Sequence, residues 1–322
     1  MSQFQTRVLP CSPAAIAEAA RLVGKGLAVA VPTETVYGLA ADATDAEAVA
    51  RIYQAKGRPA FNPLIVHVGS LAQARRLARF EASAEELAAR FWPGPLTLVL
   101  PLKPGGGIAS IVTAGLGTVA LRVPAHPAMR DLLATCRKPL AAPSANASGR
   151  LSPTRAGHVL ASLGGRIPLV IDGGPAGHGV ESTIVAPGPD GLRLLRPGPI
   201  AIGELEAASR PTRPRPLPAG EGRIEAPGQL ESHYAPAKPL RLEATEAKKD
   251  EWHIGFGGVA GDASLSAAGD LVEAAAHLFD RLHEAEASGK PRIAVAPVPE
   301  QGLGLAINDR LKRAAAPSGL GD

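Results

Sequence analysis

A short loop near residue 60 carries two cations and an amide in a stretch of chain with little conformational freedom. Lys56, Arg58 and Asn62 belong to the segment KGRPAFNPL at residues 56–64, which holds one glycine and two prolines and leads into an apolar run. A stiff loop with cations suits phosphate, because arginine can bind two oxygens at once and lysine acts as a point charge. The same residues also fit the solvated basic end of a helix, where the helix dipole attracts Lys and Arg.

Two further segments place polar side chains beside apolar runs that are typical of strands. The segment PTETVYGLA, which contains Thr35, directly follows the run at 27–31, and open α/β sheets bind ligands at such strand ends. Taken alone, this segment fits a capped turn slightly better than a site. Arg122 interrupts the apolar run at 119–123, where an arginine needs either an anion or the wet end of the sheet. Arg122 is therefore a candidate ligand for a carboxylate. His67 lies in another such run, where a single histidine is more often structural.

Small hydroxyl and amide residues follow a further apolar run in the segment AAPSANASG at residues 141–149. Small side chains let backbone N–H groups approach an anion closely, so this segment could cradle a phosphate. An ordinary turn has the same composition. Ser182, in the sequence EST at the start of another strand, and Arg196, just before Pro197, are weaker signals of the same kind.

Several familiar sites are absent from the sequence. It has no GxxxxGK[ST] phosphate loop, no HExxH, no CxxC and no GxSxG, and its eight histidines lack metal-ligand spacing. The residues therefore predict no metal site held by the protein itself. Any nucleotide chemistry would have to use a less common binding scheme.

The elements that must position these residues form the pattern of an α/β domain up to about residue 199. Ser12 followed by proline predicts a helix that ends at Gly24, and Thr44 with Glu47 has the spacing of a capping box before a second helix. The irregular spacing of the apolar runs predicts a twisted mixed sheet. The candidate strands are residues 27–31, 64–68, 96–100, 119–123, 169–171 and 182–185.

A change of composition after residue 205 indicates a linker and a second domain. Residues 210–218, RPTRPRPLP, hold four prolines and three arginines and must run extended across a surface. Beyond them, strand-like runs at 252–256 and 292–297 and helix-like stretches at 270–287 and 308–315 suggest a small α/β domain. We therefore expect domains at 1–205 and 239–322, joined by the linker at 206–238.

Length, composition and charge agree with a two-domain globular protein. The chain of 322 residues is 45% hydrophobic and 20% charged, which permits a sizeable core. The net charge is +4 and the calculated pI about 9.2, which permits anionic substrates without requiring nucleic acid. Two cysteines cannot form a disulfide framework, and no run of about 18 apolar residues could span a bilayer. We expect a soluble cytoplasmic protein with no membrane contact.

Taken together, the motifs resemble the YrdC-domain family, and the C-terminal extension narrows the resemblance to the two-domain threonylcarbamoyl-AMP synthases. The ordered set covers about the first 240 residues, and it is far more specific than any one of its members. It implies a YrdC-like twisted mixed sheet followed by a smaller Rossmann-like α/β domain. The matching segments are PTETVYGLA (32–40), KGRPAFNPLIVHV (56–68), WPGPLTLVL (92–100), LRVPAHP (121–127), APSANASG (142–149), ESTIV (181–185), LRPG (195–198) and PGQLESHYAP (227–236).

The resemblance implies a reaction in which L-threonine, bicarbonate and ATP give L-threonylcarbamoyladenylate and pyrophosphate. This is the first step towards threonylcarbamoyladenosine at position 37 of tRNA, and separate transferase proteins complete it. Mg2+ would accompany ATP, and the linker with Tyr234 would serve as a lid. By similarity, L-threonine binds Thr35, His67, Arg122, Ala142 and Ser182; ATP binds Arg58, Asn62, Thr118, Ser144, Ser152, Arg196 and Tyr234; and the family's polar catalytic cluster is Lys56, Arg58, Ser144 and Asn146.

Two other interpretations stay open at this stage. The basic pI and the arginine-rich linker would also suit an RNA-binding translation accessory module of the YrdC type, with weak contact to tRNA. Only 11 aromatic residues are present, which is few for a protein that reads bases by stacking. A relative that forms a carbamoyl adenylate on another acceptor is the third interpretation, although ESTIV and HYAP favour threonine.

Overall fold

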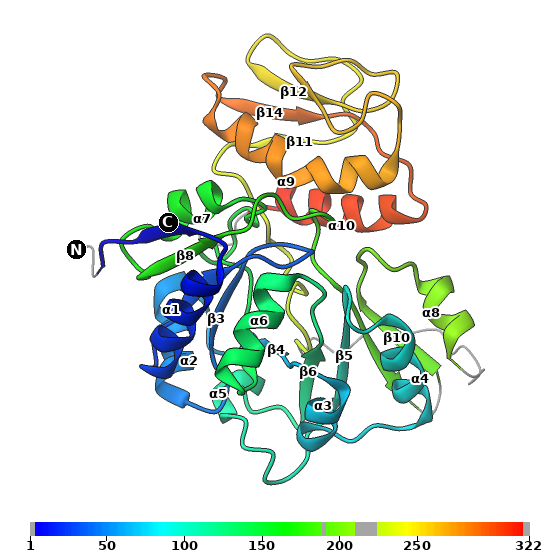
Figure 1. The fold of residues 1–322 in the computed structure, drawn as a ribbon. Helices are drawn as coiled ribbons and strands as arrows, with labels where there is room; N and C mark the ends of the chain where they lie inside the picture. The colour runs from blue at the N-terminus through cyan, green and yellow to red at the C-terminus, as the bar shows by residue number, and fades with distance from the viewer. Residues whose placement is uncertain (1–3, 189–190, 210–223, 318–322) are drawn as a thin grey trace.

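The computed structural model describes residues 4–188, 191–209 and 224–317, which form a larger and a smaller α/β domain, one above the other in Figure 1. The predicted fold class is confirmed: a large mixed sheet is followed by a smaller parallel one. The arginine- and proline-rich residues 210–218 lie outside the described residues. No helix of the described chain is long and apolar enough to cross a membrane.

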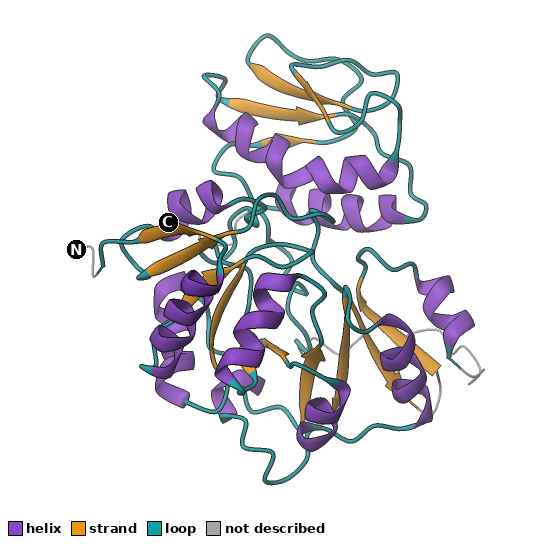
Figure 2. Cartoon of the chain, viewed as in Figure 1, coloured by secondary structure: helices purple, strands orange, loops and turns teal. Residues whose placement is uncertain are grey.

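The larger domain is built on one ten-stranded sheet, with helices against it (Figure 2). All six predicted strands are confirmed, because each apolar run is long enough for a buried strand. The strands are β1 Arg7–Pro10, β2 Val29–Val31, β3 Gly38–Asp42, β4 Ile65–His67, β5 Leu96–Pro101, β6 Thr118–Arg122, β7 Leu140–Ala141, β8 Leu169–Asp172, β9 Thr183–Gly188 and β10 Gly191–Arg196.

The order of the strands shows why spacing alone could not give the topology. The sheet runs β1-β8-β2-β3-β7-β4-β6-β5-β9-β10, with parallel and antiparallel neighbours. The parallel pair β4 and β6 brings His67 opposite Arg122 in register, although 55 residues separate them in the chain. The two polar residues therefore lie side by side at the carboxyl ends of their strands.

The helices of the larger domain begin and end where local chemistry provides caps. Ser12 accepts a hydrogen bond from the backbone N–H of Ala15, Pro13 opens the first helix, and Gly24 ends it as predicted. The capping box at Thr44 is wrong, because the Thr44 hydroxyl donates to Asp42 and the Asp45 carboxylate caps the second helix instead. The helices are α1 Pro13–Gly24, α2 Ala46–Lys56, α3 Leu71–Leu77, α4 Ala82–Phe91, α5 Ser110–Thr113, α6 Pro127–Cys136, α7 Ala156–Leu163 and α8 Ile202–Ala208.

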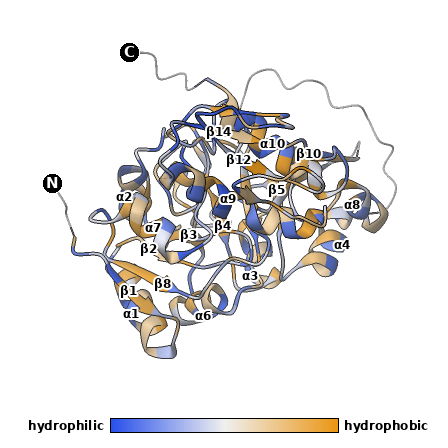
Figure 3. Cartoon of the chain, turned by 90° about the horizontal axis from the view of Figure 1, so that it is seen from above, coloured by the Kyte–Doolittle hydropathy of each residue, from blue (hydrophilic) through white to orange (hydrophobic). Residues whose placement is uncertain are grey.

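The amphipathic helices of the larger domain bury one apolar face, as α4 shows. Figure 3 shows hydrophobic and hydrophilic residues on different sides of α4 and α8. In α4 the buried residues Ala84, Leu87 and Ala88 recur at the three- and four-residue spacing of one helix face. The larger domain is therefore packed beneath the strand ends that carry the polar motifs.

The smaller domain holds a four-stranded parallel sheet in the order β11-β14-β12-β13, with two long helices on the side that faces the larger domain (Figure 1). Its hydrophobic core also contains Val36, Leu151 and Val180 of the larger domain, so the two domains share a buried interface. The predicted strands and helices beyond residue 250 are confirmed. The elements are β11 Leu240–Arg241, β12 Glu251–Gly255, β13 Ala263–Ser264, α9 Leu271–Ala287, β14 Arg292–Val295 and α10 Leu303–Ala315.

Candidate active site

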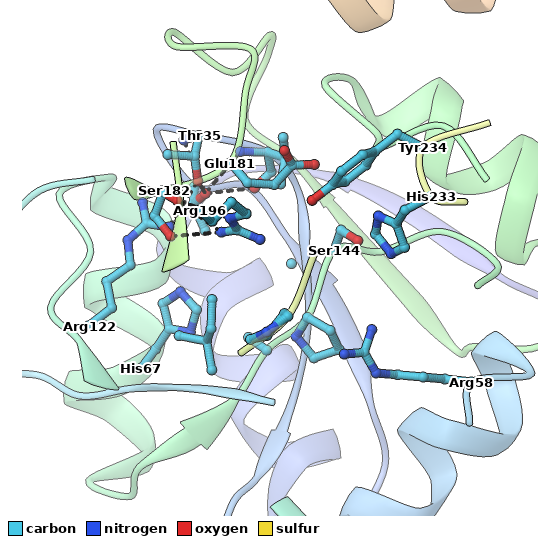
Figure 4. A pocket seen from close by; sticks show the side chains of 17 residues that line it. Thr35, Arg58, His67, Arg122, Ser144, Glu181, Ser182, Arg196, His233 and Tyr234 are labelled. Carbon is cyan, nitrogen blue, oxygen red and sulfur yellow. Dashed lines mark hydrogen bonds between the residues drawn. The ribbon is translucent and has the colours of Figure 1, made fainter. Parts of the chain in front are cut away.

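A pocket opens where the carboxyl ends of the central strands meet the chain segment that leads into the smaller domain (Figure 4). It is lined by residues from the β2–β3 turn, the loop after α2, β4, β6, the loop after β7, the two residues before β9, the end of β10 and the segment 227–234. Nine predicted site residues are brought together here: Thr35, Arg58, His67, Arg122, Ala142, Ser144, Ser182, Arg196 and Tyr234. Five are not among the lining residues: Lys56, Asn62, Thr118, Asn146 and Ser152.

Arg122 occupies one side of the pocket, with His67 next to it (Figure 4). Its guanidinium donates to the backbone oxygen of Gly94 at 3.2 Å, to the Thr35 hydroxyl at 2.9 Å and to the Glu34 carboxylate at 2.6 Å. The Arg122 side chain is only 4% exposed, so these contacts hold a buried positive charge at the wall of the pocket. Such a group is well placed to bind a carboxylate from a ligand.

The electrostatics on this side keep Glu34 charged and His67 neutral. Burial by itself would raise the pKa of Glu34, but the charge and hydrogen bond of Arg122 outweigh it and lower this pKa to about 2. Burial, helped by the nearby charge of Arg122, lowers the pKa of His67 to about 3. Neither ring nitrogen of His67 has a hydrogen-bond partner among the described residues. A neutral imidazole with free donor and acceptor groups therefore faces the pocket.

Arg58 occupies the opposite side and is held by the loop that follows α2. Its Nε donates to the backbone oxygen of Asn62 at 3.3 Å and its Nη2 to that of Pro63 at 2.9 Å. Burial lowers the pKa of Arg58 to about 10, so the guanidinium stays charged at neutral pH. The loop thus aims a fixed cation into the pocket, which agrees with the anion-site interpretation of this segment.

Arg196 lies between these two sides in Figure 4. Its Nε and Nη2 donate to the backbone oxygen of Ser182 at 3.1 and 3.0 Å, and Nη2 also reaches the Ser182 hydroxyl at 3.0 Å. That hydroxyl shares a 2.8 Å hydrogen bond with Thr97. Ser182, the residue just before β9, therefore fixes the orientation of the third buried arginine of the pocket.

Lys56 lies behind the pocket wall and supports it. Its ammonium donates to the backbone oxygens of Ser144 and Asn146, in the small-residue segment after β7. The side chain of Asn146 turns back to the backbone oxygens of Ala147 at 2.9 Å and Arg150 at 2.7 Å. The polar cluster is therefore divided: Arg58 and Ser144 face the pocket, whereas Lys56 and Asn146 hold the Ser144 segment in place.

The other three predicted residues outside the pocket wall differ in their surroundings. Asn62 is fully buried and neither side-chain atom has a partner among the described residues, so its amide remains free for a ligand. Thr118 begins β6, four residues before Arg122, at the far end of that strand. The Ser152 hydroxyl donates to Glu181 and so contacts a residue of the lining.

The sequence alone did not single out several lining residues. His233 is buried, its ring lies 4.0 Å from that of Tyr234, and its Nδ1 has no partner among the described residues. Glu181 lines the pocket with its carboxylate between Ser152 and the smaller domain. Both belong to segments quoted above, HYAP and ESTIV, so their position next to a matched residue was the available signal.

The chemistry that this arrangement favours is the binding of a polyanion. Three buried arginines and several hydroxyl groups surround one cavity. Among the described residues no group of three or more His, Cys, Asp or Glu side chains could hold a metal ion. The pocket can therefore position anionic reactants and neutralise charge that develops between them.

Two family models match the chain, one for each domain. A Sua5, YciO and YrdC family model, described as "Telomere recombination", matches residues 21–198. A model described as "Threonylcarbamoyl-AMP synthase, C-terminal domain" matches residues 200–316.

Curated relatives and a solved structure resemble the chain over nearly its whole length. A threonylcarbamoyl-AMP synthase of Pyrococcus abyssi is 41% identical and covers 92% of this chain and 93% of its own length. One of Bacillus subtilis is also 41% identical, with 93% and 92% covered. The crystal structure of P. abyssi Sua5 complexed with L-threonine superposes with a TM-score of 0.86 at 39% identity, covering 96% of this chain and 97% of that one.

Proposed function

The chain belongs to the threonylcarbamoyl-AMP synthase family, and from that premise we propose how the residues of its pocket serve the reaction. The enzyme uses ATP and L-threonine to form threonylcarbamoyl-AMP for tRNA modification. The observation that carries our assignment of roles is the convergence of Arg58, Arg122 and Arg196, all buried, on one cavity.

L-Threonine binds on the side of the pocket formed by Arg122, His67 and Thr35. Arg122 takes the α-carboxylate, because its guanidinium is buried, charged and already hydrogen-bonded to polar groups at the wall. His67, which is neutral, can accept or donate a hydrogen bond without adding charge beside Arg122. Ser182 and Ala142 complete this side.

ATP binds on the opposite side, with its phosphates against Arg58, Ser144 and Arg196. Tyr234 covers it from the segment that leads to the smaller domain and acts as part of a lid. Asn62, with both side-chain atoms unpaired among the described residues, and Thr118 bind the nucleoside end, while Ser152 acts through Glu181. Arg196 lies between Arg58 and Arg122, where the two substrates would meet (Figure 4).

The reaction needs positioning and charge neutralisation more than a protein nucleophile. The threonine amine attacks the carbon of bicarbonate, a C–N bond forms, and water leaves to give a carbamate. A carbamate oxygen then attacks the α-phosphorus, and the bond to the β-phosphate oxygen breaks as pyrophosphate departs with its electron pair. Arg58 and Arg196 neutralise the phosphate charge, and Lys56 keeps the Ser144 segment in place.

Mg2+ enters as part of the ATP substrate. The lining carboxylates, Glu34 and Glu181, each pair with an arginine, so Mg2+ would be held by the phosphate oxygens of ATP and not by these two side chains. The labile adenylate then passes to separate threonylcarbamoyl transferase proteins. Direct contact with tRNA remains a prediction from the basic sequence alone.

The test is to incubate the protein with MgATP and bicarbonate, with and without L-threonine, and to measure pyrophosphate and the mass of the adenylate. Wild-type protein should form threonylcarbamoyl-AMP only when both threonine and bicarbonate are present. Arg58→Ala should abolish the product, whereas Arg21→Ala, which removes an exposed arginine of α1, should not. A folded Arg58→Ala variant with wild-type activity would disprove the assignment of the ATP side.

A further inference from the structure

The smaller domain sends one arginine into the wall of the pocket. Arg310, in α10, is completely buried and has the largest side chain among the fully buried residues of the described chain. Burying a guanidinium costs folding free energy unless its N–H groups donate hydrogen bonds to nearby acceptors. Its acceptors therefore show what the residue does.

Two of the acceptors belong to the larger domain. Nε of Arg310 donates to Oε2 of Glu181 at 2.8 Å, and Nη1 donates to the backbone oxygen of Pro197 at 2.8 Å. Glu181 lines the pocket, and Pro197 directly follows Arg196. Nη1 also contacts Asp309 of its own helix at 2.8 Å.

The guanidinium also supports the lid residue. Its Cζ lies 5.3 Å from the centre of the Tyr234 ring, a distance typical of a cation–π contact. Tyr234 is itself buried and lines the pocket. One planar fork thus contacts the carboxylate of Glu181, the chain beside Arg196 and the ring of Tyr234.

We infer that Arg310 is a positioning residue of the reaction, through which the smaller domain assembles the ATP side of the pocket. The inference rests on the function proposed above, because that function assigns Arg196 and Tyr234 to ATP. Glu181 transmits the effect further, since its other oxygen accepts the hydrogen bond of Ser152. Arginine suits this position because its wide planar fork reaches Glu181 and Pro197 while its face lies near the Tyr234 ring, which the compact ammonium of lysine cannot do in one place.

Other ion pairs between the domains lack this connection. Arg155 pairs with Asp280 of α9, and Arg150 pairs with Glu286, but both arginine side chains are about half exposed and line no part of the pocket. Arg155→Met is therefore a matched control, because it removes an ion pair from the same domain interface without touching the pocket.

The test compares steady-state kinetics and ATP affinity for wild type, Arg310→Met, Arg310→Lys and Arg155→Met. Arg310→Met should raise KM for ATP about tenfold to hundredfold, as expected when a buried charged partner is lost, and change KM for threonine much less. The KM for ATP of Arg310→Lys should lie between those of Arg310→Met and wild type, since lysine restores the positive charge beside Glu181 but not the other contacts. Arg155→Met should stay within about twofold of wild type for both substrates.

A double variant guards against misfolding. Arg310→Met leaves the Glu181 carboxylate buried without its partner, so Arg310→Met with Glu181→Gln removes both charges and should fold while keeping the raised KM for ATP. Circular dichroism melting identifies the folded variants. The inference would be overturned if the folded double variant and Arg310→Lys both had the wild-type KM for ATP. It would also be overturned if Arg155→Met raised KM for ATP as much as Arg310→Met does.

Calorimetric titration with ATP separates this inference from the proposed function. Wild-type protein that formed no adenylate would refute the proposed function. The ranking of ATP affinities, with Arg310→Met weaker than Arg155→Met, would still support Arg310 as a residue that shapes the nucleotide side. Equal affinities would refute it.

Discussion

Replacing Gly228 by alanine would place a methyl group where the pocket wall has no space for it. The residue has φ +88°, and a Cβ atom there would lie 2.7 Å from the Tyr234 hydroxyl and 2.8 Å from Cδ of Arg196. Real Cβ contacts are essentially never shorter than 3.0 Å, so both side chains must move, or the backbone at residue 228 must shift. Both belong to the proposed ATP side.

The free-energy cost of Gly228→Ala has two parts, one from the backbone and one from crowding, which experiments can separate. A left-handed backbone costs an L-residue about 1–2 kcal/mol, which lowers the free energy of unfolding. Crowding a packed site costs roughly another 1–3 kcal/mol. If Tyr234 or Arg196 leaves its position, the lost contact with ATP corresponds to about a tenfold to hundredfold rise in KM for ATP.

Gly115→Ala is the matched control for the backbone part. Gly115 has φ +74°, but a Cβ atom there would meet nothing within 4 Å. Urea unfolding should show that the backbone cost lowers the free energy of unfolding in both variants, and that the free energy of unfolding falls further in Gly228→Ala. Steady-state kinetics should show the rise in KM for ATP in Gly228→Ala alone. Equal KM values for ATP in the two variants would refute the reasoning that this glycine makes room for the nucleotide side.

Three more predictions concern the threonine side and the supporting lysine. Arg122→Lys should raise KM for threonine about tenfold or more and leave KM for ATP nearly unchanged, because lysine lacks the planar fork that would bind the carboxylate. Steady-state kinetics with each substrate varied in turn will check this. A selective rise in KM for ATP would contradict it. Lys56→Met should lower the free energy of unfolding by about 2–4 kcal/mol, because the buried backbone oxygens of Ser144 and Asn146 lose their hydrogen-bond donor. The adenylate assay should show lost activity as well. Full activity together with wild-type stability would rule out the supporting role of Lys56. The pKa of Glu34 is about 2 in the folded protein and 4.5 ordinarily, so charged Glu34 stabilises the fold by something on the order of 3 kcal/mol above pH 4.5, and this is lost as pH falls through 2. Urea unfolding at several pH values should show that acid lowers the free energy of unfolding less in Glu34→Gln than in wild type. The same dependence on pH in both proteins would contradict the pairing with Arg122.

The elements of this fold could be predicted because their signals are local. Apolar runs such as residues 96–100 are long enough to form buried strands, and Ser12 with Pro13 caps a helix through bonds to its own first turn. The exception, Thr44, shows the limit of such patterns. Its hydroxyl bonds to Asp42, and the neighbouring Asp45 caps the helix with a stronger acceptor.

Nine of the pocket residues were also predicted, from short motifs and from the family resemblance that these motifs carry together. Thr35, Arg58, Arg122, Ser144 and Arg196 stand in loops or strand ends, where small or polar residues interrupt apolar runs, and all five line the pocket. Residue type alone points to an anion at Arg58 and Arg122, whereas the family resemblance is what assigns Thr35, Ser144 and Arg196 to the site.

Only the tertiary structure decided which of these groups face the substrate and which hold others in place. Lys56 turns to the backbone oxygens of a segment about 90 residues away in the chain, whereas the nearby Arg58 faces the pocket. Arg310 meets Glu181 across 129 residues and a domain boundary. A sequence pattern specifies the conformation of neighbouring residues, but the direction of a long charged side chain depends on which acceptors the packed domains bring within about 3 Å of it.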